Sequence, residues 1–179
     1  MIVFMINRLA TQQLITNGII AGLYVVLTIT PPLNSLAYLG VQFRVSEVLL
    51  LLVFFRKDYI VGIVIGTFIA NLFGPLGSFA WFDAVIGSLV TFGAGFLLGR
   101  TKEFWVGMIY PVFFNALYLA IFLPFALELP FEWTLISSIG FYVALGQFVV
   151  LYVLGFPLYF IFRKNRYFLR LIGATQNVR

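Results

Sequence analysis

The hydrophobic residues of this chain are gathered into long apolar runs, and most of its polar residues and prolines lie in the short breaks between them or at the two ends of the chain. Six runs occur, at 14–30, 45–55, 58–73, 79–99, 104–127 and 133–162. The first must end at Pro31-Pro32, because proline cannot continue a helix. The 45–55 run is shorter than the roughly 20 residues that a membrane-spanning helix needs. The pattern predicts an all-α membrane protein, a compact bundle of about six transmembrane helices with a loop at 33–41.

Composition supports a bilayer as the surroundings of the whole chain. Hydrophobic residues make up 63% of the 179 residues and charged residues only 9%, with a mean hydropathy of +1.08. A soluble domain usually carries about 25% charged residues. We therefore expect one integral membrane domain over residues 1–179. The chain has no histidine and no cysteine, which excludes imidazole catalysis, thiolate chemistry and the usual zinc sites. We expect no catalytic residues, no metal and no cofactor.

The basic residues predict topology. Of the 11 lysines and arginines, all but Arg44 fall on one side if all six runs cross the membrane. That side is then cytoplasmic and holds both termini. If the short 45–55 run does not cross, Arg44 joins the inside and Arg8 moves outside, so charge alone leaves five and six crossings open. The net charge of +5 is explained by these helix ends, and no nucleic-acid partner is expected.

Polar side chains at membrane depth are costly and mark functional sites. The densest group is Gln42, Arg44 and Glu47. Arg44 and Glu47 are three residues apart, so on a helix they share a face and can pair. They either form an ion pair that fixes helix packing or belong to the wall of a ligand cavity. The other candidates for a substrate-binding site are Asn71, Trp81, Asp83, Asn115, Glu128, Trp133 and Gln147.

Several of these candidates have a structural alternative. Asp83 can cap a helix N-terminus, where a carboxylate meets free N–H groups. Buried amides can join helices across a bundle. Trp81 and Trp133 can lie in the membrane interface or stack on a flat ligand.

Small residues recur every four positions in two of the runs, which allows helices to approach closely. They are Gly62, Gly66, Ala70 and Gly74 in the third run, and Gly87, Thr91, Gly95 and Gly99 in the fourth. For these runs we expect close packing inside the bundle. In the first run, Gly18, Ala21 and Gly22 form a small patch that can serve as a docking surface for another membrane protein.

The run LGVQFRVSEVL at 39–49 resembles the signature of the QueT family. Further stretches resemble the same family, namely AGLYVVLT at 21–28, GTFIAN at 66–71, FDAVIGS at 82–88 and LGFPL at 154–158. The resemblance implies an S component, the substrate-binding subunit of an energy-coupling factor (ECF) importer for queuosine precursors. S components have six helices with both ends inside, which favours the six-crossing topology.

The resemblance also implies a ligand and partners. A 7-deazaguanine base is flat, with a donor edge, a carbonyl acceptor, and a nitrile or aminomethyl group at position 7. Glu47 or Asp83 can accept from the donor edge, and Asp83 or Glu128 can pair with an aminomethyl cation. The chain has no phosphate-binding loop motif, so the family implies a partner module of a transmembrane scaffold subunit and two ATPases. Other readings are an S component for another vitamin-like substrate, a proton-coupled secondary carrier and, least supported, a lipid-modifying enzyme.

Overall fold

The computed structural model of the chain describes residues 2–38 and 41–174, and all regular structure within them is helical. The N-terminal part comprises α1 (Ile2–Ile29), α2 (Leu33–Ala37), the 3-10 helix η1 (Val45–Leu50), α3 (Leu51–Phe55), the 3-10 turn η2 (Lys57–Tyr59) and α4 (Ile60–Leu72). The middle comprises the 3-10 turn η3 (Gly77–Phe79), α5 (Ala80–Phe82), the π-helix η4 (Asp83–Gly87) and α6 (Ser88–Leu98). The C-terminal part comprises α7 (Phe104–Gly107), α8 (Ile109–Ala126), α9 (Trp133–Phe148), the π-helix η5 (Val149–Leu154), α10 (Gly155–Lys164) and α11 (Arg166–Leu171).

The six predicted apolar runs are all helical, but the first helix begins at Ile2, well before the expected residue 14. The other ends differ by a few residues from the expected ones. The first helix ends at Ile29, as the proline pair predicts. The loop predicted over 33–41 is wrong for its first half, because α2 occupies it. Pro32 stands before α2 with a φ of −85°, close to the angle that a proline ring imposes and that a helix start accepts. Leu39 and Gly40 of that loop, and Arg179 of the predicted basic side, lie outside the described residues.

Four helical stretches in the described chain are long and apolar enough to cross a membrane. They are Thr11–Ile29, Gly77–Leu98, Phe104–Ala126 and Trp133–Lys164. Their outer faces carry exposed apolar side chains such as Leu14, Phe113 and Ile121, which suits a surface in contact with lipid. The chain is therefore a multi-pass helical membrane protein. The stretches 45–55 and 57–72 are shorter, so the count of six crossings remains a prediction.

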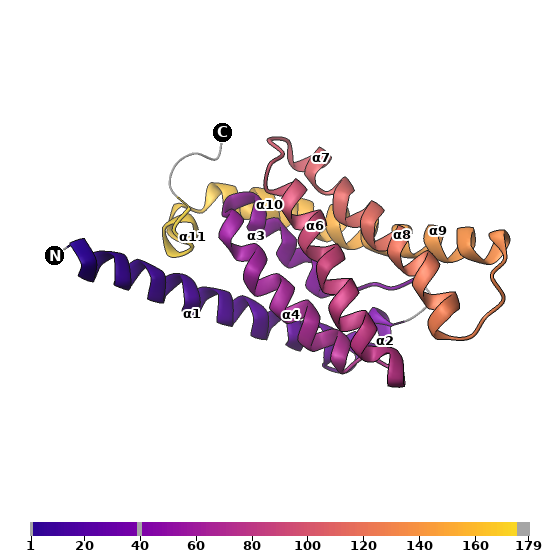
Figure 1. Cartoon of the computed structure of the whole chain (residues 1–179). Helices are drawn as coiled ribbons and strands as arrows, with labels where there is room; N and C mark the ends of the chain where they lie inside the picture. The colour runs from indigo at the N-terminus through magenta and orange to yellow at the C-terminus, as the bar shows by residue number, and fades with distance from the viewer. Residues whose placement is uncertain (1, 39–40, 175–179) are drawn as a thin grey trace.

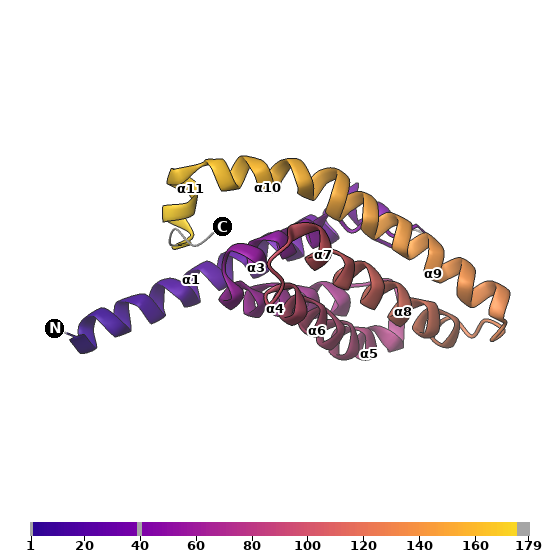
Figure 2. The same cartoon turned by 90° about the horizontal axis from the view of Figure 1, so that it is seen from above.

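The short η1–α3 stretch lies in the middle of the bundle. It packs against α1, α4, α6 and η5. Leu50, Leu51 and Val53 are almost completely buried, as expected for a helix that is apolar on all sides. In Figure 1, α4 and α6 run alongside each other, and Figure 2 shows α9 and α10 following one another along one side of the bundle.

The glycine stripe of α4 is the contact surface for α1. A Cβ atom on Gly62 would lie 2.5 Å from the carbonyl oxygen of Asn17, and one on Gly66 would lie 2.7 Å from the Cβ of Tyr24. The Gly62 N–H donates to Asn17 Oδ1 at 2.7 Å. The predicted close packing of the third run is thus confirmed, and it holds α1 and α4 at backbone contact.

Candidate functional site

Six of the predicted site residues lie around one buried cavity. They come from five parts of the chain: Gln42 and Arg44 from the segment before η1, Asn71 from α4, Asp83 from η4, Asn115 from α8 and Gln147 from α9. All six are buried, although the surrounding bundle is strongly apolar. Gly87, Thr91, Tyr118 and Leu119 complete the lining. Polar groups buried in such a place normally satisfy one another.

In this cavity they do so only in part. Within the described structure, Gln42 Oε1, Asn71 Oδ1, Gln147 Oε1 and Arg44 Nε have no hydrogen-bond partner. An unpaired buried polar group costs about 1–3 kcal/mol. Four of them around one cavity therefore indicate a site built for a polar ligand that offers both donors and acceptors.

The two charges of the cavity wall are kept apart. Arg44 supplies the cation and Asp83 the carboxylate, yet no ion pair between described residues joins them. The Arg44 guanidinium lies 5.6 Å from the centre of the Tyr38 ring. The hydroxyl of Tyr38 donates to the carbonyl oxygen of Ala70 at 3.0 Å, and burial raises the pKa of Tyr38 above its ordinary value. Tyr38 is therefore a neutral neighbour of Arg44, whose guanidinium lies over its ring.

Asp83 is fixed by its neighbours. One carboxylate oxygen, Oδ1, accepts from the Tyr118 hydroxyl at 2.9 Å, and the backbone carbonyl of Asp83 accepts from Asn71 Nδ2 at 3.0 Å. Asp83 also begins the π-helical turn η4, and such turns inside α-helices often occur at functional sites. The structural reading of Asp83 as an N-cap does not apply, because the helical turn of α5 precedes it.

Gly87 keeps the cavity open beside Asp83. A Cβ atom at this position would lie 2.7 Å from Asn71 Nδ2 and 3.1 Å from Asp83 Oδ1. The space left by the missing side chain therefore lies directly between the two polar groups. The cavity itself is small, with a volume of about 10 Å³, which is room for about one water molecule.

The segment 41–44 passes over α9 at Gly146. A Cβ atom on Gly146 would lie only 1.8 Å from the carbonyl oxygen of Val41 and 2.9 Å from that of Gln42. Gln42 itself has a positive φ of 47°, which is uncommon for a residue with a side chain. The missing side chain of Gly146 thus lets this segment come down beside Gln147.

Glu47 belongs to a separate buried network. Its Oε1 accepts from the Tyr24 hydroxyl of α1 at 2.7 Å, and it is not part of the cavity lining. In the neighbouring contact, the Thr28 hydroxyl donates to Ser46 Oγ at 2.7 Å. The predicted Arg44–Glu47 ion pair does not form among the described residues. The ion pair is absent because η1 begins after Arg44 as a 3-10 helix, in which Glu47 is directed to α1.

Three predicted site residues lie away from the cavity. Trp81 is 64% exposed and Trp133 is 86% exposed, so neither covers a buried ligand in this conformation. Glu128 is exposed in the connection between α8 and α9. The prediction missed Tyr118, although Asn115, Tyr118 and Leu119 are spaced three and four apart on one helix face and so carried a usable signal.

The fold and the cavity define a multi-pass membrane protein with an internal polar cavity. The QueT transporter family model matches residues 14–164, so this chain belongs to that family. A protein from Lactococcus lactis subsp. cremoris (strain MG1363), the queuosine precursor transporter QueT, is 38% identical over 160 residues, which cover 82% of this chain and 89% of that protein. No solved structure matches the chain significantly.

Proposed function

We propose that this protein is the S component of an ECF importer and captures a queuosine precursor with a 7-deazaguanine base for ATP-driven uptake. Family membership supports a transporter, and the relative from Lactococcus lactis is named for this class of substrate. The observation that carries the proposal is the set of unpaired polar atoms around the buried cavity.

The unpaired atoms complement the groups of such a base. The side-chain oxygens of Gln42, Asn71 and Gln147 can accept hydrogen bonds from the ring N–H and the exocyclic amine of the base. Arg44 Nε can donate a hydrogen bond to the ring carbonyl. Binding would replace unpaired groups on both sides by hydrogen bonds, so a ligand that lacks one of these groups is strongly disfavoured.

The carboxylate of Asp83 is the proposed partner of the substituent at position 7. An aminomethyl group there is cationic, and a charge-assisted hydrogen bond to Asp83 is about twice as strong as a neutral one. Asp83 Oδ1 is already held by Tyr118. The carboxylate therefore enters the interaction preorganised and loses little freedom on binding.

Tyr118→Phe tests whether this preorganisation of Asp83 contributes to the affinity for the ligand. The substitution removes the hydroxyl that donates to Asp83 but keeps the aromatic ring, which stacks on Phe122 at 5.1 Å. We expect the affinity for the aminomethyl base to fall about three- to tenfold, the effect of about one hydrogen bond. Tyr110→Phe is the matched control on α8, because the Tyr110 hydroxyl makes no hydrogen bond with the described residues. Equal affinities for both variants would contradict a positioning role for Tyr118.

The proposed topology has six crossings in a prokaryotic plasma membrane, with both termini in the cytoplasm. The family's partner module would then contact α1. Gly18 and Gly22 are exposed on α1, and a Cβ atom at either would meet no atom within 4 Å. Ala21 is buried, and its carbonyl oxygen lies against Gly66 of α4. The proposed docking surface therefore consists of Gly18 and Gly22, and Ala21 supports it from inside.

Calorimetry on the detergent-purified protein tests the function. We expect saturable binding of 7-deazaguanines with an aminomethyl or nitrile group and none of guanine or riboflavin. Folded protein that binds no deazaguanine would overturn the substrate assignment. Uptake by the protein alone in liposomes, driven by a proton gradient, would instead support a secondary carrier over an S component.

A further inference from the structure

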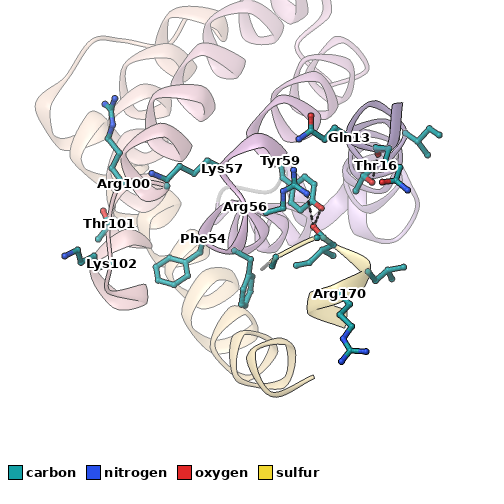
Figure 3. A pocket seen from close by; sticks show the side chains of 18 of the residues that line it. Gln13, Thr16, Phe54, Arg56, Lys57, Tyr59, Arg100, Thr101, Lys102 and Arg170 are labelled. Carbon is teal, nitrogen blue, oxygen red and sulfur yellow. Dashed lines mark hydrogen bonds between the residues drawn. The ribbon is translucent and has the colours of Figure 1, made fainter. Parts of the chain in front are cut away.

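Figure 3 shows a second, larger cavity of about 1140 Å³. It lies at the other end of α4 from the candidate substrate site. Asn71 of the first site is near the end of α4, whereas Lys57 and Tyr59 of the second precede its start. With 13 residues in α4, the helix alone separates the two sites by about 20 Å. The second cavity is therefore independent of the groups proposed to hold the base.

The walls of this cavity are basic. Arg56, Lys57, Arg100, Lys102 and Arg170 line it, and Glu103 is its one acidic lining residue among those described. In Figure 3, these cations come from three distant parts of the chain: the α3–α4 turn, the α6–α7 connection and α11. The fold thus concentrates positive charge that the sequence distributes over more than 100 residues.

Three of these cations are available to a ligand. Arg56 pairs with Asp58 at 2.9 Å, and the Arg100 guanidinium lies 3.6 Å from the centre of the Phe96 ring. Lys57, Lys102 and Arg170 are exposed and form no ion pair with any described residue. Uncompensated positive charge in a concave site attracts an anion of matching size.

The same cavity has an apolar border. Ile15 of α1 and Leu171 of α11 line it and are 57% and 70% exposed. Next to Ile15, Leu14 is also largely exposed on a helix that is long and apolar enough to cross the membrane. A ligand held here would therefore place an anionic group on the lysines and have hydrocarbon surface directly beside it.

We propose that this cavity binds the phosphate-containing headgroup of an anionic phospholipid, with its acyl chains along the exposed apolar side chains of α1 and α11. Basic pockets between transmembrane helices on the cytoplasmic side hold such headgroups in membrane proteins. The volume accommodates a glycerol-linked headgroup as well as its phosphate. Bound lipid would join α1, the α3–α4 turn and α11, which meet at this cavity.

The α3–α4 turn and the C-terminal segment already make direct contact here. The Tyr59 hydroxyl donates to the carbonyl oxygen of Ile172, and Arg56 Nη1 donates to the same oxygen at 3.4 Å. These contacts fix the floor of the cavity and leave Lys57 and Arg170 exposed to a headgroup.

Native mass spectrometry and thermal unfolding of the purified protein test the proposal, with short-chain phosphatidylglycerol as the probe. We expect phosphatidylglycerol to remain bound and to raise Tm, whereas phosphatidylcholine with the same chains does neither. Lys57→Gln combined with Lys102→Gln should weaken phosphatidylglycerol binding about tenfold or more, because each lysine attracts the anionic lipid. Both residues are exposed, so the loss of their charge should not prevent folding.

Lys164→Gln combined with Arg166→Gln is the matched control. It removes the same charge from exposed positions that do not line the cavity, and it should leave lipid binding within about twofold. Equal losses in both double variants, or no preference for phosphatidylglycerol, would overturn the proposal in favour of general surface charge. A Tm rise with inorganic phosphate as large as that with the lipid would assign the cavity to a soluble phosphate and overturn its assignment to phospholipid. None of these outcomes depends on the deazaguanine assignment.

Discussion

Asp83→Asn is expected to weaken binding of an aminomethyl-7-deazaguanine about 30- to 1000-fold, because it removes the one carboxylate among the described residues that line the candidate substrate cavity. The nitrile analogue carries no cation at position 7, so its affinity should fall far less. Asparagine keeps an oxygen that can accept from Tyr118, and the fold should be preserved. Calorimetry with both ligands measures the two losses, and Tm of the variant reports on folding.

The comparison between the two ligands separates the roles open to Asp83. A large loss for the aminomethyl base alone places Asp83 against the substituent. Equal losses for both ligands would move Asp83 to the donor edge of the base and contradict the proposed orientation. Glu132→Gln is the control, since Glu132 is exposed before α9, and it should leave both affinities within about twofold.

Gly146→Ala is expected to lower both stability and ligand affinity. The added methyl group would lie 1.8 Å from the backbone oxygen of Val41, so the 41–44 segment has to move. That segment carries Gln42 and Arg44, two of the cavity's lining residues. Overpacking of this kind typically costs about 1–3 kcal/mol. We therefore expect a clear decrease in Tm and a loss of affinity of about tenfold or more.

Gly93→Ala in α6 is the matched control for this substitution. Its added Cβ would have Phe114 Cε1 as its nearest neighbour, at an ordinary 3.9 Å. Alanine favours a helix over glycine by up to about 1 kcal/mol, so this variant should be as stable as the parent or slightly more so. Unchanged Tm and affinity in Gly146→Ala would show that the 41–44 segment does not need its contact with α9.

The sequence by itself determined the membrane class, the helical runs and the family resemblance. These properties depend on local composition and on short motifs, since a run of apolar residues ending at Pro31-Pro32 defines a helix wherever it packs. The glycine spacing of α4 likewise predicted a close helix contact, which the contact of Gly62 with Asn17 confirms. The QueT family assignment from the 39–49 run is also confirmed.

The sequence predicted which side chains are chemically unusual, but not which of them meet. Gln42, Asn71, Asp83 and Gln147 were selected because polar groups are costly in an apolar bundle, and the structure places all four around one cavity. Trp81 was selected because its ring can stack on a flat ligand, and it lies outside the cavity. The difference is set by how each helix is rotated about its axis, a property that depends on its neighbours.

Only the tertiary structure decided three features of this protein. The 3-10 form of η1 directs Glu47 to Tyr24 of α1, which separates it from Arg44. The packing of α8 brings the Tyr118 hydroxyl to Asp83. The meeting of Lys57 and Lys102 at one cavity requires the α3–α4 turn and the α6–α7 connection to lie at the same end of the bundle. Each is a contact between segments far apart in the sequence, and such contacts follow from packing that local patterns do not encode.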